Sequence, residues 1–158
     1  MKKKDYKKIA KDVINLEINA LKKLKNSINN SFNDAVDVIV KCQSKVILCG
    51  VGKSGLIAAK ISATFSSVGT PSFSLSANDC SHGDLGSISK KDILILISYS
   101  GSTEELKNII KYANRNKITL IGIMSKKKLD IIQSFWYQAP YSRGNRGRSW
   151  YRSNFKYN

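Results

Sequence analysis

"DILILISYSGSTEEL", residues 92–106, joins the clearest strand pattern in this sequence to an unusual polar turn. A run of aliphatic residues ends at Ser98, and small hydroxyl residues and glycine follow it before the acids Glu104 and Glu105. A short uninterrupted aliphatic run is typical of a strand that is buried on both faces of a parallel sheet. Behind the turn, apolar residues recur every three or four positions, which indicates an amphipathic helix.

The same change of period occurs along most of the chain. Two amphipathic helical patterns precede the first strand pattern, and strand and helix patterns then alternate. The patterns predict helices at 4–28, 31–43, 53–69 and 103–117, and strands at 45–50, 71–75, 91–98 and 118–124. This order predicts an α/β fold with a mostly parallel sheet, helices on its faces and an N-terminal helical arm. Ligands of such sheets bind beyond the carboxyl ends of the strands.

Length and composition indicate one globular domain. The chain has 158 residues, of which 42% are hydrophobic, and this is enough for a core. No apolar run approaches the roughly 18–20 residues of a membrane span, and the lysine-rich start lacks the hydrophobic stretch of a signal peptide. The three cysteines are an odd number without C-x-x-C spacing and indicate reduced thiols. We therefore expect a cytoplasmic protein with no membrane partner.

The net charge of +16 raises the question of nucleic-acid binding. The lysines, however, are scattered over predicted helix surfaces or clustered at the start and at Lys126–Lys128. No recognisable nucleic-acid module accompanies them. We therefore expect no nucleic-acid partner, and we keep nucleic-acid binding as a hypothesis that rests on charge alone.

The turn after the strand at 91–98 gathers hydroxyl groups. Ser98, Ser100, Ser102 and Thr103 surround Gly101 where the strand passes into a helix. Backbone N–H groups at a helix start, together with hydroxyl donors and the helix dipole, suit a phosphate dianion. A helix cap, with the two acids in the first turn, is the alternative. Because one cap accounts for only one hydroxyl, we favour an anion site.

Two further loops carry unusual residues. "GVGKSG" (50–55) is neither a full P-loop nor a complete dinucleotide loop, but its glycines permit close approach of the backbone to a ligand. Lys53 would then project toward that ligand, or else be an ordinary solvated lysine. "SHGDLG" (81–86) holds the only histidine, His82, which is either structural or a proton carrier near neutral pH.

Together, "GVGKSG", "SHGDLGSI" and "SYSGSTEEL" resemble the loops of the sugar isomerase (SIS) domain. More narrowly, they resemble those of the arabinose-5-phosphate isomerase family, which interconverts arabinose 5-phosphate and ribulose 5-phosphate in the supply of Kdo for lipopolysaccharide or capsule. The likeness covers residues 5–130. It implies an SIS-type, flavodoxin-like sheet, a sugar-phosphate substrate and a homo-oligomer.

The resemblance also implies roles for individual residues. Three residues would be catalytic and six would bind the substrate or its phosphate: Lys53, His82 and Glu105 in the first group, and Ser54, Gly69, Thr70, Ser98, Ser100 and Thr103 in the second. Aldose–ketose isomerisation passes through an enediol, so it needs a general base, a proton shuttle and a cation that stabilises the developing negative charge. No cofactor is required. Family members that are proposed to bind an inhibitory metal carry histidine where this chain has Ser76, so we expect no metal.

The last 25 residues depart from the resemblance. Residues 134–158 contain no Ile, Leu, Val or acid, but they hold both tryptophans and four of the five arginines. The family instead continues with another strand, the motifs E-A-x-P and P-T-S-S-T, further catalytic Glu and His residues, and usually a pair of CBS domains. We therefore predict an incomplete SIS domain at 1–133 and an unrelated basic, aromatic tail at 134–158.

A shifted reading frame would explain this tail. Read one base later, the codons possible for "SNFKYN" (153–158) include Pro-Thr-Ser-Ser-Thr-Thr, and those for 142–152 include the sequence PEVTEADPGIV. A natural tail that binds RNA or membrane is the alternative. The nucleotide sequence across codons 120–160 separates the two, because the frameshift requires E-A-x-P and P-T-S-S-T in the next frame.

Three functions are consistent with these observations. The first is the aldose–ketose isomerase, the second is a sugar-phosphate-binding module without catalysis, and the third is a nucleic-acid-binding protein. We expect the apolar face of residues 9–28 to pack on a partner subunit. We also expect the missing strands of the family to leave the sheet with an exposed hydrophobic edge.

Overall fold

The computed structural model describes residues 5–99, 104–125 and 133–138. Its elements follow the predicted order closely, with boundaries within a few residues of the sequence patterns. They are α1 (Tyr6–Ser27), α2 (Asn30–Val40), β1 (Val46–Gly50), α3 (Lys53–Ser67), β2 (Ser72–Ser76), the short 3₁₀ helices η1 (Asp79–His82) and η2 (Asp84–Ser87), β3 (Ile93–Ser98), α4 (Glu104–Asn116), β4 (Thr119–Ser125) and β5 (Gln133–Gln138).

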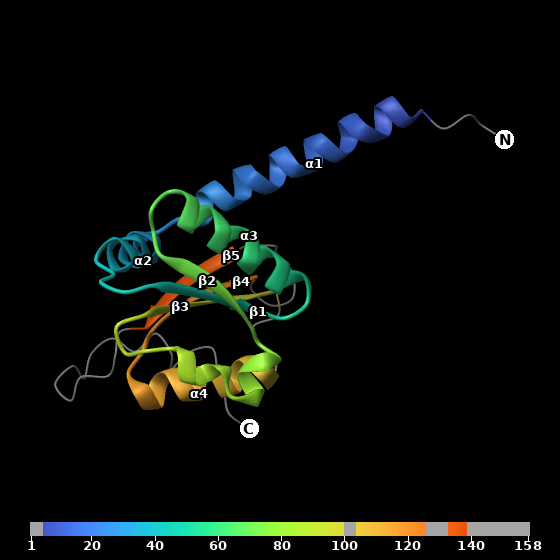
Figure 1. Cartoon of the computed structure of the whole chain (residues 1–158). Coiled ribbons are helices and arrows are strands. Elements are labelled where there is room, and N and C mark those ends of the chain that lie inside the picture. The colour runs from blue at the N-terminus through green and yellow to red at the C-terminus, as the bar shows by residue number, and fades with distance from the viewer. Residues whose placement is uncertain (1–4, 100–103, 126–132, 139–158) are drawn as a thin grey trace, which may run out of the picture.

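The strands form one sheet in the order β2-β1-β3-β4-β5 (Figure 1). The first four strands run parallel, and β5 pairs antiparallel with β4. From β1 the chain passes through α3 to β2 on one side, and it then returns to β3 on the other side of β1. The predicted α/β fold with a mostly parallel sheet is therefore confirmed.

Alternate side chains of the central strands supply two cores. On one face, Val46 and Leu48 pack in a cluster with Ala58 of α3 and Ala35 of α2. On the other face, the neighbouring strand residues pack in a cluster with α4 and η1, and this cluster contains Ile47, Cys49, Cys80, Leu106 and Ile109. Figure 1 shows α2 and α3 above the sheet and α4 below it. Because both faces are covered, the central strands β1 and β3 are aliphatic along most of their length, as the sequence patterns indicated.

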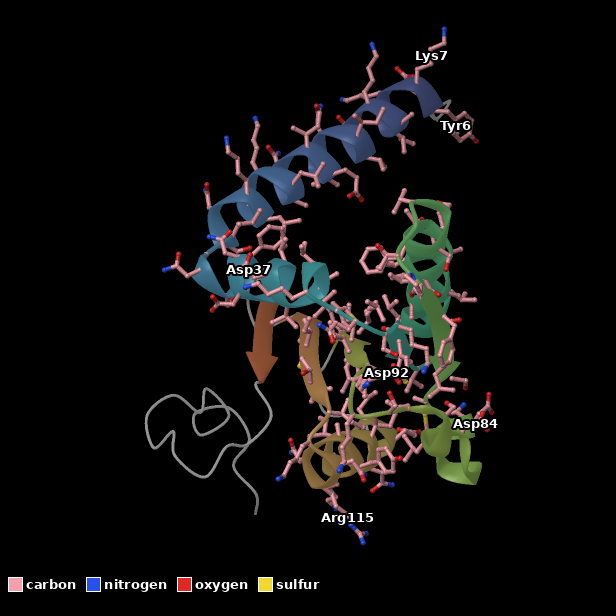
Figure 2. All side chains as sticks on the ribbon, turned by 60° about the vertical axis from the view of Figure 1, so that its left-hand side comes forward. Tyr6, Lys7, Asp37, Asp84, Asp92 and Arg115 are labelled. Carbon is pink, nitrogen blue, oxygen red and sulfur yellow. The ribbon has the colours of Figure 1, made fainter. Side chains whose placement is uncertain are left out.

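Helix α1 forms the predicted arm. It has no buried residue, and its outer end lies far from the sheet, as Tyr6 and Lys7 show in Figure 2. Its apolar side chains are largely exposed: Ile9 is 48% exposed, Val13 51% and Leu16 68%. None of the helices in the described part of the chain combines the length and apolarity that crossing a membrane requires.

β4 is not the edge of the described sheet, and the expectation of an exposed hydrophobic edge stays a prediction. β5 pairs along β4 from Leu120 opposite Gln138 to Ser125 opposite Gln133, so β5 is the edge of the described sheet. The composition of residues 134–158 hid this strand, because it lacks the Ile, Leu and Val on which the strand prediction relied. The boundary at residue 133 stays a prediction, and residues 139–158 lie outside the described part of the chain.

A buried carboxylate joins the amino ends of β1 and β3. Asp92 is 1% exposed, and its oxygens accept hydrogen bonds from the Ser44 hydroxyl at 2.6 Å, the Ser89 backbone N–H at 2.6 Å and the Lys45 ammonium at 3.0 Å. Burial by itself would raise the pKa of Asp92, but these hydrogen bonds outweigh it and hold the pKa below the ordinary value of 3.8.

We expect the Asp92→Asn variant to lose about 2–3 kcal/mol of unfolding free energy at neutral pH, because the amide cannot accept from all three donors. Since the folded pKa is the lower one, the contribution of Asp92 is fully present above the ordinary pKa and is lost as pH falls through the folded pKa. Urea unfolding at pH 7 and at about pH 3 measures both effects, and the gap between the wild type and the variant should narrow at the acidic pH. An equal gap at both pH values would contradict this account.

Candidate functional site

Two of the unusual loops begin side by side at the carboxyl edge of the sheet. Gly50, the last residue of β1, lies opposite Ile97 of β3, and Ser98 follows at the end of β3. The chain leaves β1 toward α3 on one face and leaves β3 toward α4 on the opposite face. This divergence between neighbouring strands is the topological switch point at which open α/β sheets bind their ligands. The structure thus brings the "GVGKSG" loop and the start of the hydroxyl-rich turn together.

Glycine at two positions of the first loop allows the strand and the helix to approach closely. A Cβ atom on Gly50 would lie 2.7 Å from the backbone carbon of Ser54 and 2.9 Å from the backbone nitrogen of Gly55. A Cβ atom on Gly55 would lie 3.0 Å from the Gly50 carbonyl oxygen. Between them, Gly52 has a φ of 55°, a conformation that side chains disfavour. The loop is therefore built around its glycines.

The start of α3 points its backbone donors at the same edge. Gly52 is the N-cap and supplies no side-chain hydrogen bond, while its carbonyl accepts from the N–H groups of Gly55 and Leu56. Helix starts without a side-chain cap can take an anion as their acceptor, and the helix dipole adds to the attraction. Lys53 is exposed there and Ser54 is half-buried. A cation and a hydroxyl thus stand at the first turn of α3.

The second loop is described only at its two ends. Ser98 is 7% exposed, and Tyr99, directly behind it, is 72% exposed. Ser100 and Thr103 lie outside the described residues, so their predicted roles stay predictions. Helix α4 begins at Glu104, and the Glu105 side chain in its first turn is half-buried. In the sequence, Glu105 thus follows the carboxyl end of β3 by seven residues.

The third loop lies on the α4 side of the sheet, where Figure 2 shows Asp84 on the same side as Arg115 of α4. It folds as η1 and η2, joined by Gly83 with a φ of 116°. It begins three residues after β2 ends, at the same carboxyl edge as the other loops. The backbone of His82 is the last residue of η1, whereas its side chain lies outside the described part.

Two of the predicted site residues, Gly69 and Thr70, do not lie at the carboxyl edge of the sheet. Gly69 has a φ of 89° at the end of α3, and the Thr70 N–H closes the helix on the Phe65 carbonyl at 2.9 Å. β2 starts just behind them at Ser72, which lies opposite Val46 at the amino end of β1. The fold therefore places these two residues at the edge opposite to Lys53, Ser54 and Ser98 of the same chain.

The sequence analysis missed Tyr99 as a candidate. In the sequence it stands between Ser98 and Ser100, its side chain is largely exposed, and its position in the turn was the only signal.

The described residues contain no group of three or more His, Cys, Asp or Glu side chains that could hold a metal ion.

Comparison with known proteins assigns the fold and its loops to a family. The SIS domain model matches residues 39–144, which is more than half of the chain. The chain belongs to the SIS domain family. The match includes all three loops and reaches past residue 133, where the composition changes.

Several proteins similar to this SIS chain are named for one reaction. Arabinose 5-phosphate isomerase KdsD of Yersinia pestis is 42% identical over 121 residues, which are 77% of this chain and 37% of that protein. The Francisella tularensis protein of the same name is 42% identical over 122 residues, 75% of this chain and 37% of that protein. The chain thus spans well under half the length of these relatives.

A solved structure supports the same placement. The Escherichia coli CFT073 protein c3406, in complex with arabinose 5-phosphate, superposes with a TM-score of 0.73 at 37% identity, covering 80% of this chain and 67% of that chain. The SIS-type arrangement of a parallel sheet between helices is therefore confirmed by both topology and superposition.

Proposed function

We propose that this SIS chain is an aldose–ketose isomerase that interconverts D-arabinose 5-phosphate and D-ribulose 5-phosphate. The observation that carries the proposal is the superposition on the E. coli CFT073 protein in complex with arabinose 5-phosphate, together with around 40% identity to proteins named arabinose 5-phosphate isomerase. The loops at the carboxyl edge of the sheet supply the residue types that this reaction needs. A cytoplasmic location agrees with the three free thiols.

The phosphate would bind first, at the edge where two helices begin. Ser54, Ser98, Ser100 and Thr103 offer hydroxyl donors, and the uncapped start of α3 offers backbone N–H groups. Neutral donors and a helix dipole suit a dianion, because they neutralise charge without a competing proton transfer. The sugar carbons would then extend from this anchor toward the other loops.

The chemical step moves one proton between neighbouring carbons. A general base, Glu105 or His82, would remove the proton from C2 of the aldose and return a proton to C1, while a proton passes between the two oxygens. The intermediate is an enediol that carries developing negative charge on oxygen. The exposed ammonium of Lys53 would stabilise that charge.

A homo-oligomer is part of the proposal. Gly69 and Thr70 lie at the sheet edge opposite to the other site residues, so they can line a substrate site only in a second copy. The exposed apolar side chains of α1 and of α3, among them Leu56 at 74% and Ile57 at 51%, offer surface for that contact.

A sugar-phosphate-binding module without catalysis is the second candidate. It is favoured by the sequence, because the family motifs E-A-x-P and P-T-S-S-T are not among its residues. Such a module would bind arabinose 5-phosphate and form no ribulose 5-phosphate. Turnover and binding must therefore be measured separately.

We expect the full 158-residue chain to bind arabinose 5-phosphate and to convert it to ribulose 5-phosphate, measured by calorimetry and by a ketose assay. Ser100→Ala should weaken binding about 10- to 100-fold, which corresponds to one hydrogen bond to a charged group. Ser74→Ala, on an exposed serine of β2, is the matched control and should bind as the wild type does. Binding without turnover would favour the module, and no binding at all would overturn both candidates.

A further inference from the structure

Helix α1 carries an apolar face that the described part of its own chain leaves open to solvent. The helix has no buried residue, and Figure 1 shows it extending away from the sheet. Three large side chains of this face, Val13, Ile14 and Leu21, are 51%, 57% and 63% exposed. A contiguous exposed apolar surface marks an interaction site. The helix therefore needs a partner that covers it.

A single acid stands in the middle of this face. Residues three and four positions apart are neighbours on the surface of a helix. By that spacing the neighbours of Glu17 are all apolar, and they are Val13, Ile14, Ala20 and Leu21. Among the described residues, the Glu17 carboxylate has no ion-pair partner. A surface complementary to this face is therefore apolar and carries one cation.

The outer face of α3 has this composition. Leu56 is 74% exposed and Ile57 is 51% exposed, and the exposed Lys60 lies one turn behind them. Ala63 follows on the same side and is small enough to let another helix come close. The sequence of α3 contains no acid, and within the described ranges the Lys60 ammonium has no ion-pair partner.

The chemistry of the two faces identifies a second copy of the chain as the partner. Because every copy carries both faces, α1 of each copy can cover α3 of the other, and a two-fold axis then closes the pair. A membrane surface fits α1 less well, although the helix is rich in lysine. It would take up the apolar face together with Glu17 and would offer that carboxylate no cation among the lipid chains.

We propose that α1 of one copy packs on the outer face of α3 of a second copy, with Glu17 paired to Lys60 of the partner subunit at the centre of the contact. Apolar side chains of both helices surround the pair and exclude water, which strengthens the attraction and fixes the register of the helices. This inference rests on the homo-oligomer that is part of the proposed function, and it names the contact. Its test uses no substrate, so the contact can fail while the isomerase activity stands, and the reverse.

Two charge reversals in the full chain test the contact. In a pair of Glu17→Lys chains, or of Lys60→Glu chains, like charges face each other at both contacts. Sedimentation velocity should show that the wild type associates and that either variant alone associates roughly 100-fold more weakly, since two pairs are lost and each is worth about tenfold or more. Circular dichroism should show folded variants, because both residues are exposed.

A mixture of the two variants is the decisive sample. Mixed in equal amounts, they should associate as the wild type does. At one contact the introduced lysine meets the introduced glutamate, and at the other contact the two native residues meet. Recovery on mixing requires a contact between copies, because a helix α1 that folded back on α3 of its own chain would gain nothing from the second variant.

Asp12→Lys and Lys111→Glu are the matched controls, because they make the same charge changes at exposed positions outside the two faces. Two neighbours of Asp12, Lys8 and Asn15, are polar, and Lys111 belongs to α4 on the other side of the sheet. Alone or mixed, both should associate as the wild type does. Charge reversals without effect at Glu17 and Lys60, or a mixture that does not recover, would overturn the inference. A monomeric wild type would do so too, and its binding to vesicles of anionic phospholipid would assign α1 to a membrane instead.

Discussion

Replacing Gly50 with alanine is expected to cost about 3 kcal/mol of unfolding free energy, near the upper end for overpacking in a core. The new Cβ would meet the Ser54 backbone carbon at 2.7 Å and its carbonyl oxygen at 2.8 Å. Real Cβ contacts do not come this close, and backbone atoms cannot rotate away as a side-chain tip can. Either β1 or the first turn of α3 must therefore move. The midpoint of urea unfolding, followed by circular dichroism, measures the loss.

Gly86→Ala is the matched control for this prediction. A Cβ atom on Gly86 meets nothing within 4 Å, and its φ lies outside the left-handed range, so the substitution should change stability by less than about 0.5 kcal/mol. The first turn of α3 also carries Lys53 and Ser54, so the same displacement should disturb the site. Gly50→Ala should therefore lose sugar-phosphate binding at urea concentrations at which it is still folded. A Gly50→Ala protein with the wild-type midpoint would contradict the close packing of β1 on α3.

Replacing Glu105 with glutamine is expected to lower kcat for arabinose 5-phosphate by about 10³-fold, the range typical of a lost general base. Glutamine keeps the shape of the side chain and removes only its basicity, so KM should change little. The residue lies in the first turn of α4, is half-buried, and follows Ser98 at the end of β3 by seven positions. A ketose assay over a range of substrate concentrations separates kcat from KM.

Glu104→Gln is the matched control, because it removes the same charge from the same turn of α4. We expect it to keep kcat within about threefold of the wild type, since the resemblance implies a catalytic role for Glu105 and none for Glu104. If Glu105→Gln retains its kcat and His82→Gln loses it, the general base is His82 and the assignment to Glu105 is wrong. This prediction rests on the proposed isomerase function.

The sequence predicted those parts of the fold whose evidence is local. The strand at 91–98 was identified from its aliphatic run, because burial on both faces demands apolar residues at every position. The helices were identified from their three- and four-residue spacing, since one face packs on the sheet. The strand at 133–138 was missed for the same reason, because its residues carry no aliphatic pattern.

The candidate site was predicted less completely. Its loops contain the small and polar residues that mark turns, so "GVGKSG", "SHGDLG" and the turn behind Ser98 could be found without a structure. The need for glycine at Gly50 could not be measured, because it depends on how closely α3 approaches the strand. The location of Gly69 and Thr70 could have been predicted, because a loop that leads from a helix into a strand of a parallel sheet lies at the amino edge, whereas ligands bind at the carboxyl edge.

By itself, then, the sequence determined the α/β class, the order of helices and strands and the three loops that carry the chemistry. Only the tertiary structure decided which of these come together. The strand order places Gly50 beside Ile97 and Ser98, and the packing of η1 on the sheet brings Cys49 and Cys80 into one core cluster. The physical reason is that periodicity records whether a residue is buried, whereas proximity follows from how distant segments pack, which no local pattern encodes.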